Sequence, residues 1–563
     1  MTTIIKHVQA KVNDSVLDRV SRLYSASVTD ILHELLQNAR RANASRIDLT
    51  TTVVDGQSLL TIADDGKGVA DPALLLSLGE SQWQRQEVMA EDPAGMGFFS
   101  LALRPHVVVR SHDWCLSLQP DHFSGIQAAP VTNAPAIQGT QITFPLSEQE
   151  TKNLTGIVKA MRFFPLPLLL NGTAIERDDF LAEATVVNEW QGLRIGVYER
   201  NVWRWGYDPT LNFYGITIKA ILPSLGQNHR YNGNLSVKAL MVRVDVRNCS
   251  GLRLVLPARK EVVKDAFWQE LTHACWQFIY RHIGSWSGHR LPFCAWEAAH
   301  GQYGVTLEPA MAELCQFFPR NADSRNQEIP SEIAVVSMDS NSLLIDQDDI
   351  AEPIQHLLNR AVAQQPLSRQ LLLAHPPYQG YAWYDALPHL TNLQIMVQEG
   401  DKILAMQERE QSHGENRFVD AIWLEGQVVQ RGEIVETLRL PVDVGFSDVD
   451  SCLFMPSDMT IFVTKNHQMD VEKLTDLLTD AYFYPDECGD RHDTQWEEFT
   501  KQATNVALQL LLSPDEAARE TIKRVVLEEV RWHIPCQTRA IITIEAGNAD
   551  ITLEPLEPTP AQP

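Results

Sequence analysis

The stretch HELLQNARRANAS, residues 33–45, places a carboxylate and an amide on what is otherwise the pattern of an ordinary amphipathic helix. Glu34 and Asn38 are one helical turn apart, so their side chains project from the same face, beside the apolar stripe. That face is either solvated, which makes the pair incidental, or it lines a pocket. The segments that follow, up to about residue 146, distinguish the two.

The helix that carries this pair is predicted from its hydrophobic spacing and its N-terminal residues. Ser27 or Thr29 can cap its first turn, and Ser27 with Asp30 approximates a capping box. Its core stripe consists of Ile31, Leu32, Leu35 and Leu36. Two strands are expected next, at 46–54 and 58–66, because both segments contain β-branched residues and are bounded by turn residues.

Glycine-rich turns follow the second strand and precede the next helical run. In DDGKGV, residues 64–69, Asp64 ends the strand and can accept hydrogen bonds in a cleft, while the glycines permit close approach of a ligand. In EDPAGMGFFSLAL, residues 91–103, two glycines precede a run that we expect to be helical, and backbone amides there suit phosphate oxygens. GTQITFPL, residues 139–146, opens an alternating strand. Each pattern alone is usually structural, but their order and spacing together indicate a nucleotide site.

This ordered set resembles the GHKL ATPases, which include gyrase B subunits, heat-shock chaperones, histidine kinases and the mismatch-repair protein MutL. Glu34 and Asn38 fit the N box, whose run ELLQNARRANASRIDL is closest to the chaperone and mismatch-repair versions. Residues 64–68 fit the DxGxG box, residues 95–97 the second glycine box and residues 139–140 the third. The four boxes cover about the first 145 positions in the family's order.

The resemblance implies an α/β fold, an α+β sandwich of the Bergerat type, that holds ATP and Mg²⁺. Glu34 would activate the attacking water as general base, and Asn38 would coordinate Mg²⁺. Asp64 would bind the adenine amino group, supported by Thr140. The other residues implied for the nucleotide are Gly66 and Gly68 at the adenine, residues 70–95 as a lid, and Gly95, Met96, Gly97 and Phe98 at the phosphates.

Two departures narrow the resemblance. No helical phosphoacceptor-histidine motif precedes this domain, so kinase activity is not expected. The mismatch-repair branch has an acidic residue where Arg41 stands and a glycine where Asn43 stands. Both differences concern the branch of the superfamily and leave the nucleotide residues unchanged.

Five regions are expected along the chain. They are an ATP-binding domain at 1–150, a transducer-like βαβ domain at 151–285, a mixed α/β region at 286–470, a mainly helical region at 471–552 that ends with a strand at 539–546, and a disordered Pro-rich tail at 553–563. In the second region, the loop PARKEVVKD would direct Lys260, or Arg259 beside it, to the γ-phosphate. The alternative for this loop is a solvated helix start.

Composition limits the other classes of function. The eight cysteines contain no CxxC pair, which argues against a zinc module. No apolar stretch approaches the roughly 20 residues of a membrane span, and the N-terminus lacks the layout of a signal peptide, so we expect a cytoplasmic protein without a membrane partner. A net charge of −25 disfavours nonspecific nucleic-acid binding. The best candidate for a local basic patch is the alternating set Arg243, Arg247 and Arg253, expected on the polar face of a half-buried sheet.

Three functions are compatible with these features. The first is an ATPase that acts as a clamp or in a chaperone-like manner, with ATP favouring lid closure and homodimerisation around an unidentified protein partner or client. The second is a nucleotide-gated scaffold with little turnover that acts with an effector in stress response or phage defence. The third is DNA processing of the mismatch-repair type. The acidic charge counts against it, and so does LLIDQDDIAEPIQHLL, residues 343–358, which only faintly resembles a nuclease metal motif.

Overall fold

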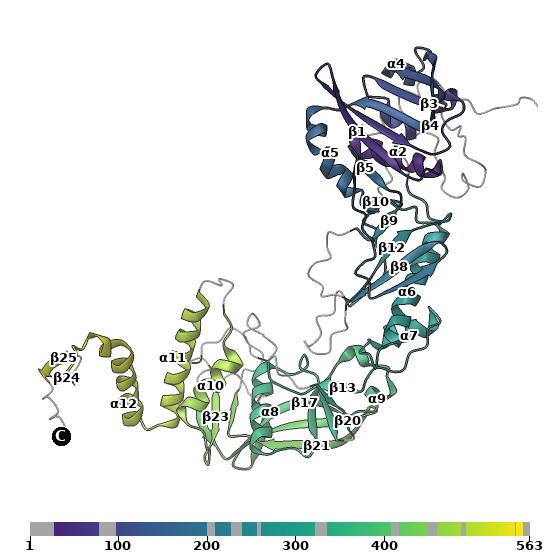
Figure 1. Ribbon diagram of the computed structural model, residues 1–563. Helices are drawn as coiled ribbons and strands as arrows, with labels where there is room; N and C mark the ends of the chain where they lie inside the picture. The colour runs from purple at the N-terminus through teal and green to yellow at the C-terminus, as the bar shows by residue number, and fades with distance from the viewer. Residues whose placement is uncertain are drawn as a thin grey trace, which may run out of the picture. The chain divides into compact units, whose positions relative to one another are not determined.

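The computed structural model describes residues 27–77, 97–199, 209–226, 239–255, 261–320, 335–339, 341–406, 416–446, 456, 459–485, 491–545 and 548–555. These residues form a mixed α/β protein whose larger sheets contain both parallel and antiparallel pairs (Figure 1). They divide into two compact units, the first ending at Pro309 and the second beginning at Ala310. Among the described helices, none has the length and apolar character needed to cross a membrane.

The first sheet contains six strands in the order β3-β4-β2-β1-β5-β6. Their bounds are β1 Ile47–Val54, β2 Gln57–Asp64, β3 Val107–Leu118, β4 Val131–Pro145, β5 Leu168–Leu170 and β6 Thr173–Ala174. The β1–β5 pair is parallel, and Ile47 lies opposite Leu168 in it. The sheet therefore continues to Ala174, beyond the domain boundary expected at residue 150.

Helices cover one face of this sheet (Figure 1). They are α2, Val28–Arg41; α5, Glu148–Ala160; and the short 3-10 helix η2, Gly97–Leu101. Burial alternates along β1 and β3, because one side of each strand faces these helices. The expected α2 stripe is buried, and the Ser27 hydroxyl accepts the Asp30 N–H at 3.2 Å, so Ser27 is the N-cap.

The helix expected after the second glycine box is only the five-residue η2. Its continuation is a tight turn in which the Arg104 N–H donates to the Leu101 carbonyl at 2.9 Å. Pro105 follows, which has no N–H and disfavours α-helical conformation in the residue before it. The segment after the second glycine box thus has the sequence pattern of a helix, but Pro105 prevents a helix from continuing past residue 104.

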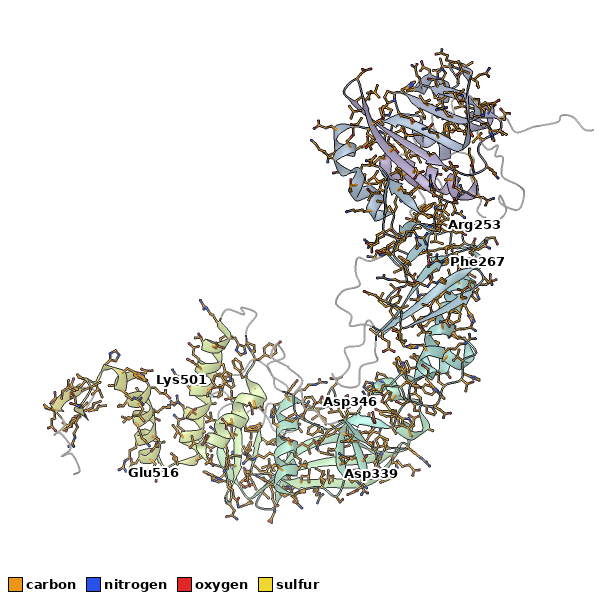
Figure 2. All side chains as sticks on the ribbon, viewed as in Figure 1. Arg253, Phe267, Asp339, Asp346, Lys501 and Glu516 are labelled. Carbon is orange, nitrogen blue, oxygen red and sulfur yellow. The ribbon has the colours of Figure 1, made fainter. Side chains whose placement is uncertain are left out.

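A second sheet in the first unit has the order β10-β9-β12-β8-β7, with β11 paired to β12. The strands are β7 Val186–Trp190, β8 Leu193–Glu199, β9 Leu211–Phe213, β10 Ile216–Ile218, β11 Ser224–Leu225 and β12 Leu240–Val246. The long helix α6, Ala266–Gly284, packs on it, capped by Asp265, whose carboxylate also binds Arg253 at 2.8 Å (Figure 2). The hydrophobic core between this sheet and α6 also includes Ala299 of α7, Phe293–Gly301. The packed unit therefore continues past the boundary expected at residue 285.

The second unit contains one large mixed sheet and three small ones. The large sheet has the order β16-β15-β17-β20-β21, with β18 paired to β17; the small ones are β19-β23-β22, β13-β14 and β24-β25. The strands are β13 Glu313–Cys315, β14 Val335–Ser337, β15 Ser342–Ile345, β16 Gln370–Leu373, β17 His389–Glu399, β18 Lys402–Ala405, β19 Arg417–Val419, β20 Ala421–Gln430, β21 Glu433–Pro441, β22 Val444–Phe446, β23 Ile461–Thr464, β24 Thr538–Glu545 and β25 Asn548–Pro555. The helices are α8 Glu352–Gln364, α9 Ala382–Asp385, α10 Val471–Tyr482, α11 His492–Leu511 and α12 Pro514–Val525.

The end of the chain contains a β-hairpin after its helices. In the described part of the region 471–552, β24 overlaps the strand expected at 539–546, and most of β25 follows it. The tail expected to be disordered from residue 553 begins inside β25, because Leu553 lies opposite Ala540 and Pro555 opposite Thr538. Residues 556–563 lie outside the described residues.

Candidate functional site

Helix α2 directs the Glu34 carboxylate at the backbone of Gly97. Glu34 is only 5% exposed, although an acidic side chain loses hydration when it is buried. A Cβ built on Gly97 would lie 2.2 Å from Glu34 Oε2, so only glycine at the start of η2 leaves the carboxylate its place. The N box and the second glycine box therefore meet at this point.

Asn38 lies one turn after Glu34 on α2 and is partly exposed. Its Oδ1 accepts a hydrogen bond from Arg41 Nη1 at 3.2 Å. Arg41 is one of the two positions at which the N box departs from the mismatch-repair pattern. The oxygen expected to bind Mg²⁺ is thus held by a cation of the same helix.

Asp64 ends β2 and begins the glycine turn of the DxGxG box. Its Oδ1 accepts the Gly66 N–H at 2.9 Å. Burial raises the pKa of the Asp64 carboxyl, and hydrogen bonds from the backbone of Gly66 and Thr140 oppose that rise. The neighbouring Asp65 serves another purpose, since it accepts the Ser45 N–H at 2.6 Å and has a lowered pKa.

The two glycines of this turn lie against other elements of the site. A Cβ on Gly66 would be 2.7 Å from the carbonyl oxygen of Ala42, the C-cap of α2. The same oxygen accepts the Lys67 N–H at 2.9 Å. Gly68 has φ +72°, in the left-handed region, and its Cβ would meet Ser111 Oγ at 2.7 Å. The turn is therefore packed directly on the end of α2.

Thr140 lies beside Asp64, because the two residues are opposite each other in the β2–β4 pair. It is 9% exposed. Gly139 precedes it with φ +73°, and a Cβ there would be 1.9 Å from the Asp64 carbonyl oxygen. The third glycine box thus also converges on Asp64, through backbone contact.

Ser111 is a residue of this site that the sequence did not reveal. It is fully buried on β3, its hydroxyl donates to the Gly139 carbonyl at 2.7 Å, and it accepts the Val69 N–H at 2.9 Å. A single hydroxyl therefore joins the DxGxG turn to the third glycine box. Its one sequence signal is a small polar residue at an inward position of the alternating run VVVRSHDW.

The described site has two ends joined by α2. Asp64, its glycine turn and Thr140 lie at the C-terminal end of the helix, against Ala42. Glu34, which lies against Gly97, is eight residues before Ala42 on α2, roughly 12 Å along the helix axis. This separation suits a nucleotide with its base at the aspartate end and its terminal phosphate at the glutamate end.

Several expected site residues are not part of this geometry. Gly95, Met96, Arg259 and Lys260 lie outside the described residues, as does the expected lid from residue 78 onward. Phe98 is described, but its ring is buried and lies 5.7 Å from the ring of Phe123. Its side chain belongs to the core, which leaves only its backbone for a phosphate.

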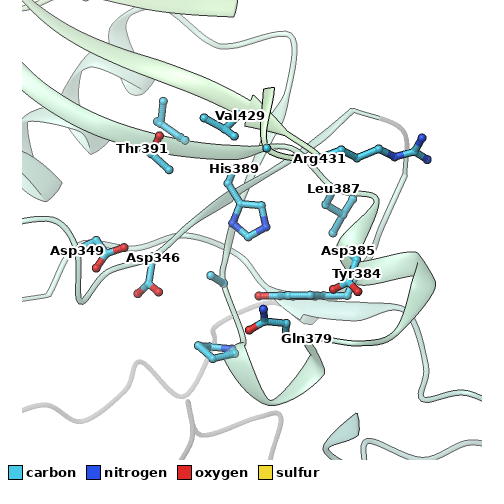
Figure 3. A pocket seen from close by; sticks show the side chains of 14 residues that line it. Asp346, Asp349, Gln379, Tyr384, Asp385, Leu387, His389, Thr391, Val429 and Arg431 are labelled. Atoms are coloured by element: carbon cyan, nitrogen blue, oxygen red, sulfur yellow. The ribbon is translucent and has the colours of Figure 1, made fainter. Parts of the chain in front are cut away.

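The second unit has a cavity of about 420 Å³ beside the carboxyl ends of the parallel strands β15 and β16 (Figure 3). Its polar lining consists of Asp346, Asp349, Gln379, Tyr384, Asp385, His389, Thr391 and Arg431. Burial raises the pKa of Tyr384 to about 12 and lowers that of His389. Asp346 and Asp349 belong to the nuclease-like stretch, yet no cluster of three or more His, Cys, Asp or Glu side chains within the described ranges could hold a metal ion.

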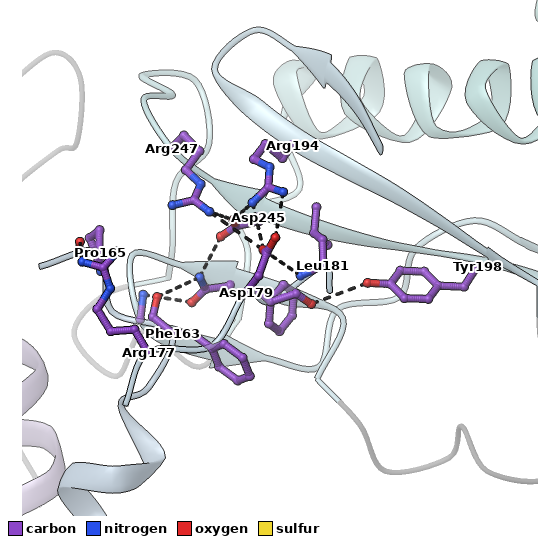
Figure 4. Close-up of polar contacts among 12 residues, drawn as sticks. Phe163, Pro165, Arg177, Asp179, Leu181, Arg194, Tyr198, Asp245 and Arg247 are labelled. Atoms are coloured by element: carbon purple, nitrogen blue, oxygen red, sulfur yellow. Dashed lines mark hydrogen bonds and ion pairs between the residues drawn. The ribbon is translucent and has the colours of Figure 1, made fainter. Parts of the chain in front are cut away.

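Of the three arginines expected to form a basic patch, Arg247 and Arg253 are paired with carboxylates, and Figure 4 shows the Arg247 pair. The third, Arg243, lies with its guanidinium carbon 5.3 Å from the centre of the Tyr198 ring. The buried Asp245 lies 2.9 Å from Arg247 and 3.3 Å from Arg194, and Arg194 also binds Asp179 at 2.9 Å. Burial raises the pKa of Asp245, whereas Arg194 lowers that of Asp179. The positive charge of Arg253 is paired with the carboxylate of Asp265, the N-cap of α6, as described above. Pairing of this kind removes most of the positive potential expected of a basic patch.

No protein-family model and no curated protein matches the chain. Among solved structures, it is similar to the ATPase region of topoisomerase II from Saccharomyces cerevisiae, with 9% sequence identity and a TM-score of 0.30. The match covers 41% of this chain and 76% of that chain. A likeness this distant assigns no family, so any function has to be supported by the residues of the site.

Proposed function

We propose that this protein is an ATPase of the GHKL type. The observation that carries the proposal is the convergence of four short sequence boxes on one helix. Glu34 and Gly97 meet at one end of α2, and Asp64, Gly66 and Thr140 meet at the other. Packing explains each glycine separately, because an added Cβ would meet a neighbouring element. A bound nucleotide explains why carboxylates, Glu34 and Asp64, lie beside glycine turns at both ends of one helix.

In this proposal each side chain acts on one part of ATP. Asp64 accepts the adenine amino group. Gly66 and Gly68 allow the turn that carries Asp64 to pack directly against α2 and β3. Gly97 exposes its amide to the phosphates at the start of η2. Glu34 takes the proton of the attacking water as the bond between the β- and γ-phosphates breaks, giving ADP and phosphate.

The residues present also fit a magnesium ion. Mg²⁺ at nucleotide sites takes few protein ligands, together with waters and phosphate oxygens, and one amide oxygen on α2 meets that need. Asn38 would hold it. When bound, the ion neutralises charge on the phosphate oxygens. Arg41 donates to the same oxygen, and its positive charge repels the ion, which weakens metal binding.

The cycle proposed for the protein is that of a clamp. ATP orders the lid and favours a homodimer, and hydrolysis releases it so that a protein partner or client is held only in the ATP state. For the hydrolysis-deficient Glu34→Ala chain, we expect a larger sedimentation coefficient with ATP than with ADP. Identical coefficients in both nucleotides would contradict the clamp.

A second candidate is a nucleotide-gated scaffold with little turnover that acts with a partner effector. One contact favours it, namely the hydrogen bond from Arg41 to the expected magnesium ligand. A DNA-processing role is weaker, because Arg194, Arg247 and Arg253 are all paired with aspartates.

The test combines ATP binding and turnover in three variants. Glu34→Ala is expected to bind ATP with about the parent affinity but to lose turnover by roughly 10²–10⁴-fold, the usual contribution of a general base. Asp64→Asn is expected to weaken binding by roughly 10–100-fold, through loss of a charged hydrogen bond. Glu148→Ala, at an exposed carboxylate of α5, is the matched control and should behave as the parent. Normal turnover by Glu34→Ala, or a parent chain that binds no ATP with Mg²⁺, would refute the proposal.

A further inference from the structure

The turn between β9 and β10 has an unusual residue at its first central position. Tyr214 has φ +49° and Gly215 has φ +96°, the pair of positive values typical of a two-residue hairpin turn. Glycine and asparagine tolerate this conformation, whereas a bulky side chain seldom adopts it. A Cβ on Gly215 would also lie 3.1 Å from Phe164 Cα, so the turn is closely packed. Strain of this kind persists where neighbouring contacts impose it and points to a role for the residue.

The neighbour that Tyr214 contacts is the helix of the candidate site. Gln37 Nε2 donates to the Tyr214 carbonyl at 2.7 Å, and Gln37 is 1% exposed. The guanidinium carbon of Arg40 lies 3.8 Å from the centre of the Tyr214 ring, in a cation–π contact. Arg40 Nε also donates to Gln37 Oε1 at 3.3 Å. Gln37 and Arg40, on successive turns of α2, thus both contact Tyr214. Both lie between Glu34 and the C-terminus of the helix.

The other side of the turn is fixed by a buried polar network (Figure 4). Asn212 Oδ1 accepts the Gly215 N–H at 2.9 Å, and Asn212 Nδ2 donates to Asp245 Oδ1 at 2.7 Å. Asp245 is in turn held by Arg194 and Arg247, as described above. Because every link is short and mostly buried, the turn is a rigid support rather than a loose loop.

We propose that Gln37 and Tyr214 are positioning residues that set the rotation of α2 and thereby the places of Glu34 and Asn38. The inference rests on the proposed ATPase function. A side chain reaches roughly 6 Å from the axis of a helix, so a rotation of about 10° moves its end by about 1 Å. A displacement of that size is enough to reduce a positioned catalytic group's contribution by about 10²-fold.

The experiment measures kcat for ATP hydrolysis and the Kd of ATP with Mg²⁺ in the full chain. Gln37→Met keeps the length of the side chain and removes the hydrogen bond. Tyr214→Gly keeps the carbonyl and relieves the strained φ, but it removes the ring from Arg40. Both are expected to lower kcat by about 10–100-fold while Kd changes by less than about threefold, because the groups that bind the nucleotide remain.

Two further variants separate positioning from a general loss of structure. Tyr214→Phe retains the ring and the carbonyl that contact α2, and it loses only the hydroxyl, which accepts the Cys249 N–H at 3.3 Å. Because both contacts with α2 remain, it should keep the parent kcat. Gln191→Gly changes the corresponding position, φ +45°, of the turn between β7 and β8 in the same sheet, where the side chain is exposed. It should also hydrolyse ATP as the parent does.

Each outcome decides the inference. A fall in kcat confined to Gln37→Met and Tyr214→Gly supports it, and if one of these two fails to fold, the other decides. Parent kcat in both, with active parent protein, overturns the positioning role and leaves the ATPase intact. Equal losses in Tyr214→Phe or Gln191→Gly would show a nonspecific effect and overturn it as well. A parent chain without turnover overturns both this inference and the proposed function.

Discussion

Replacing Gly97 by alanine tests the site at the point where its geometry is tightest. The added Cβ would lie 2.2 Å from Glu34 Oε2, against an ordinary contact of about 3.5 Å, so the carboxylate has to move by roughly 1.3 Å. The added Cβ meets the end of the Glu34 side chain rather than backbone, and Gly97 does not have a positive φ, so the fold accommodates the change. A misplacement of about 1 Å costs on the order of 10²-fold in rate, or about 2.7 kcal/mol of transition-state stabilisation.

The assay is steady-state ATP hydrolysis at saturating ATP, with thermal unfolding measured in parallel. Gly156→Ala on α5 is the matched control, because nothing lies within 4 Å of its added Cβ and alanine favours a helix by about 0.5–1 kcal/mol. In a chain that already carries Glu34→Ala, Gly97→Ala should cause no further loss, since both changes act on the same carboxylate. If Gly97→Ala alone retains the parent kcat, Glu34 is not the group that activates water.

Three other changes have outcomes that follow from the structure. Gly139→Ala combines a positive φ with a Cβ 1.9 Å from a backbone oxygen of β2, so urea unfolding should show a loss of at least about 1–3 kcal/mol. Glu150, whose pKa is lowered from 4.5 to about 2 chiefly by its hydrogen bond with Arg104, stabilises the fold fully above pH 4.5 and progressively less as the pH falls toward 2. The shift corresponds to at most about 3 kcal/mol, which partial exposure reduces to about 1–2, and parallel pH–stability curves for the parent and Glu150→Gln would contradict it. Arg41→Ala should release Asn38 Oδ1 and lower the Mg²⁺ concentration for half-maximal turnover by roughly 10-fold, which a magnesium titration measures.

Local elements of the first sheet could be predicted from the sequence because their signals are local. The Ser27 cap, the apolar stripe of α2 and the hairpin of β1 and β2 each depend on residues within a few positions of one another. Such patterns state which face is buried before any tertiary contact is known.

What the sequence could not reveal depends on contacts between distant residues. Gln37 and Tyr214 are 177 positions apart, and nothing in either segment indicates the other. The parallel pairing of β1 with β5 joins residues 121 positions apart, Ile47 and Leu168, which is why the boundary expected at residue 150 divides the sheet. In β12, the alternating pattern assigns Asp245 to the polar face, yet partners from β8 and β9 cover it, and it is buried.

The choice between an active ATPase and a nucleotide-gated switch depends on Arg41, a residue of the stretch 33–45. Glu34 is buried and held beside Gly97, which favours turnover, because a fixed base needs no reorganisation. Asn38 shares its oxygen with Arg41, which opposes turnover, because a hydrogen bond from a charged donor stabilises the metal-free form by about 1.5–3 kcal/mol. That range corresponds to roughly 10–100-fold in metal affinity. With Arg41 present, the ATP-bound state is therefore expected to persist without hydrolysis whenever Mg²⁺ is scarce. With Arg41 removed, the same pocket is expected to bind Mg²⁺ more readily and to hydrolyse ATP in repeated turnovers.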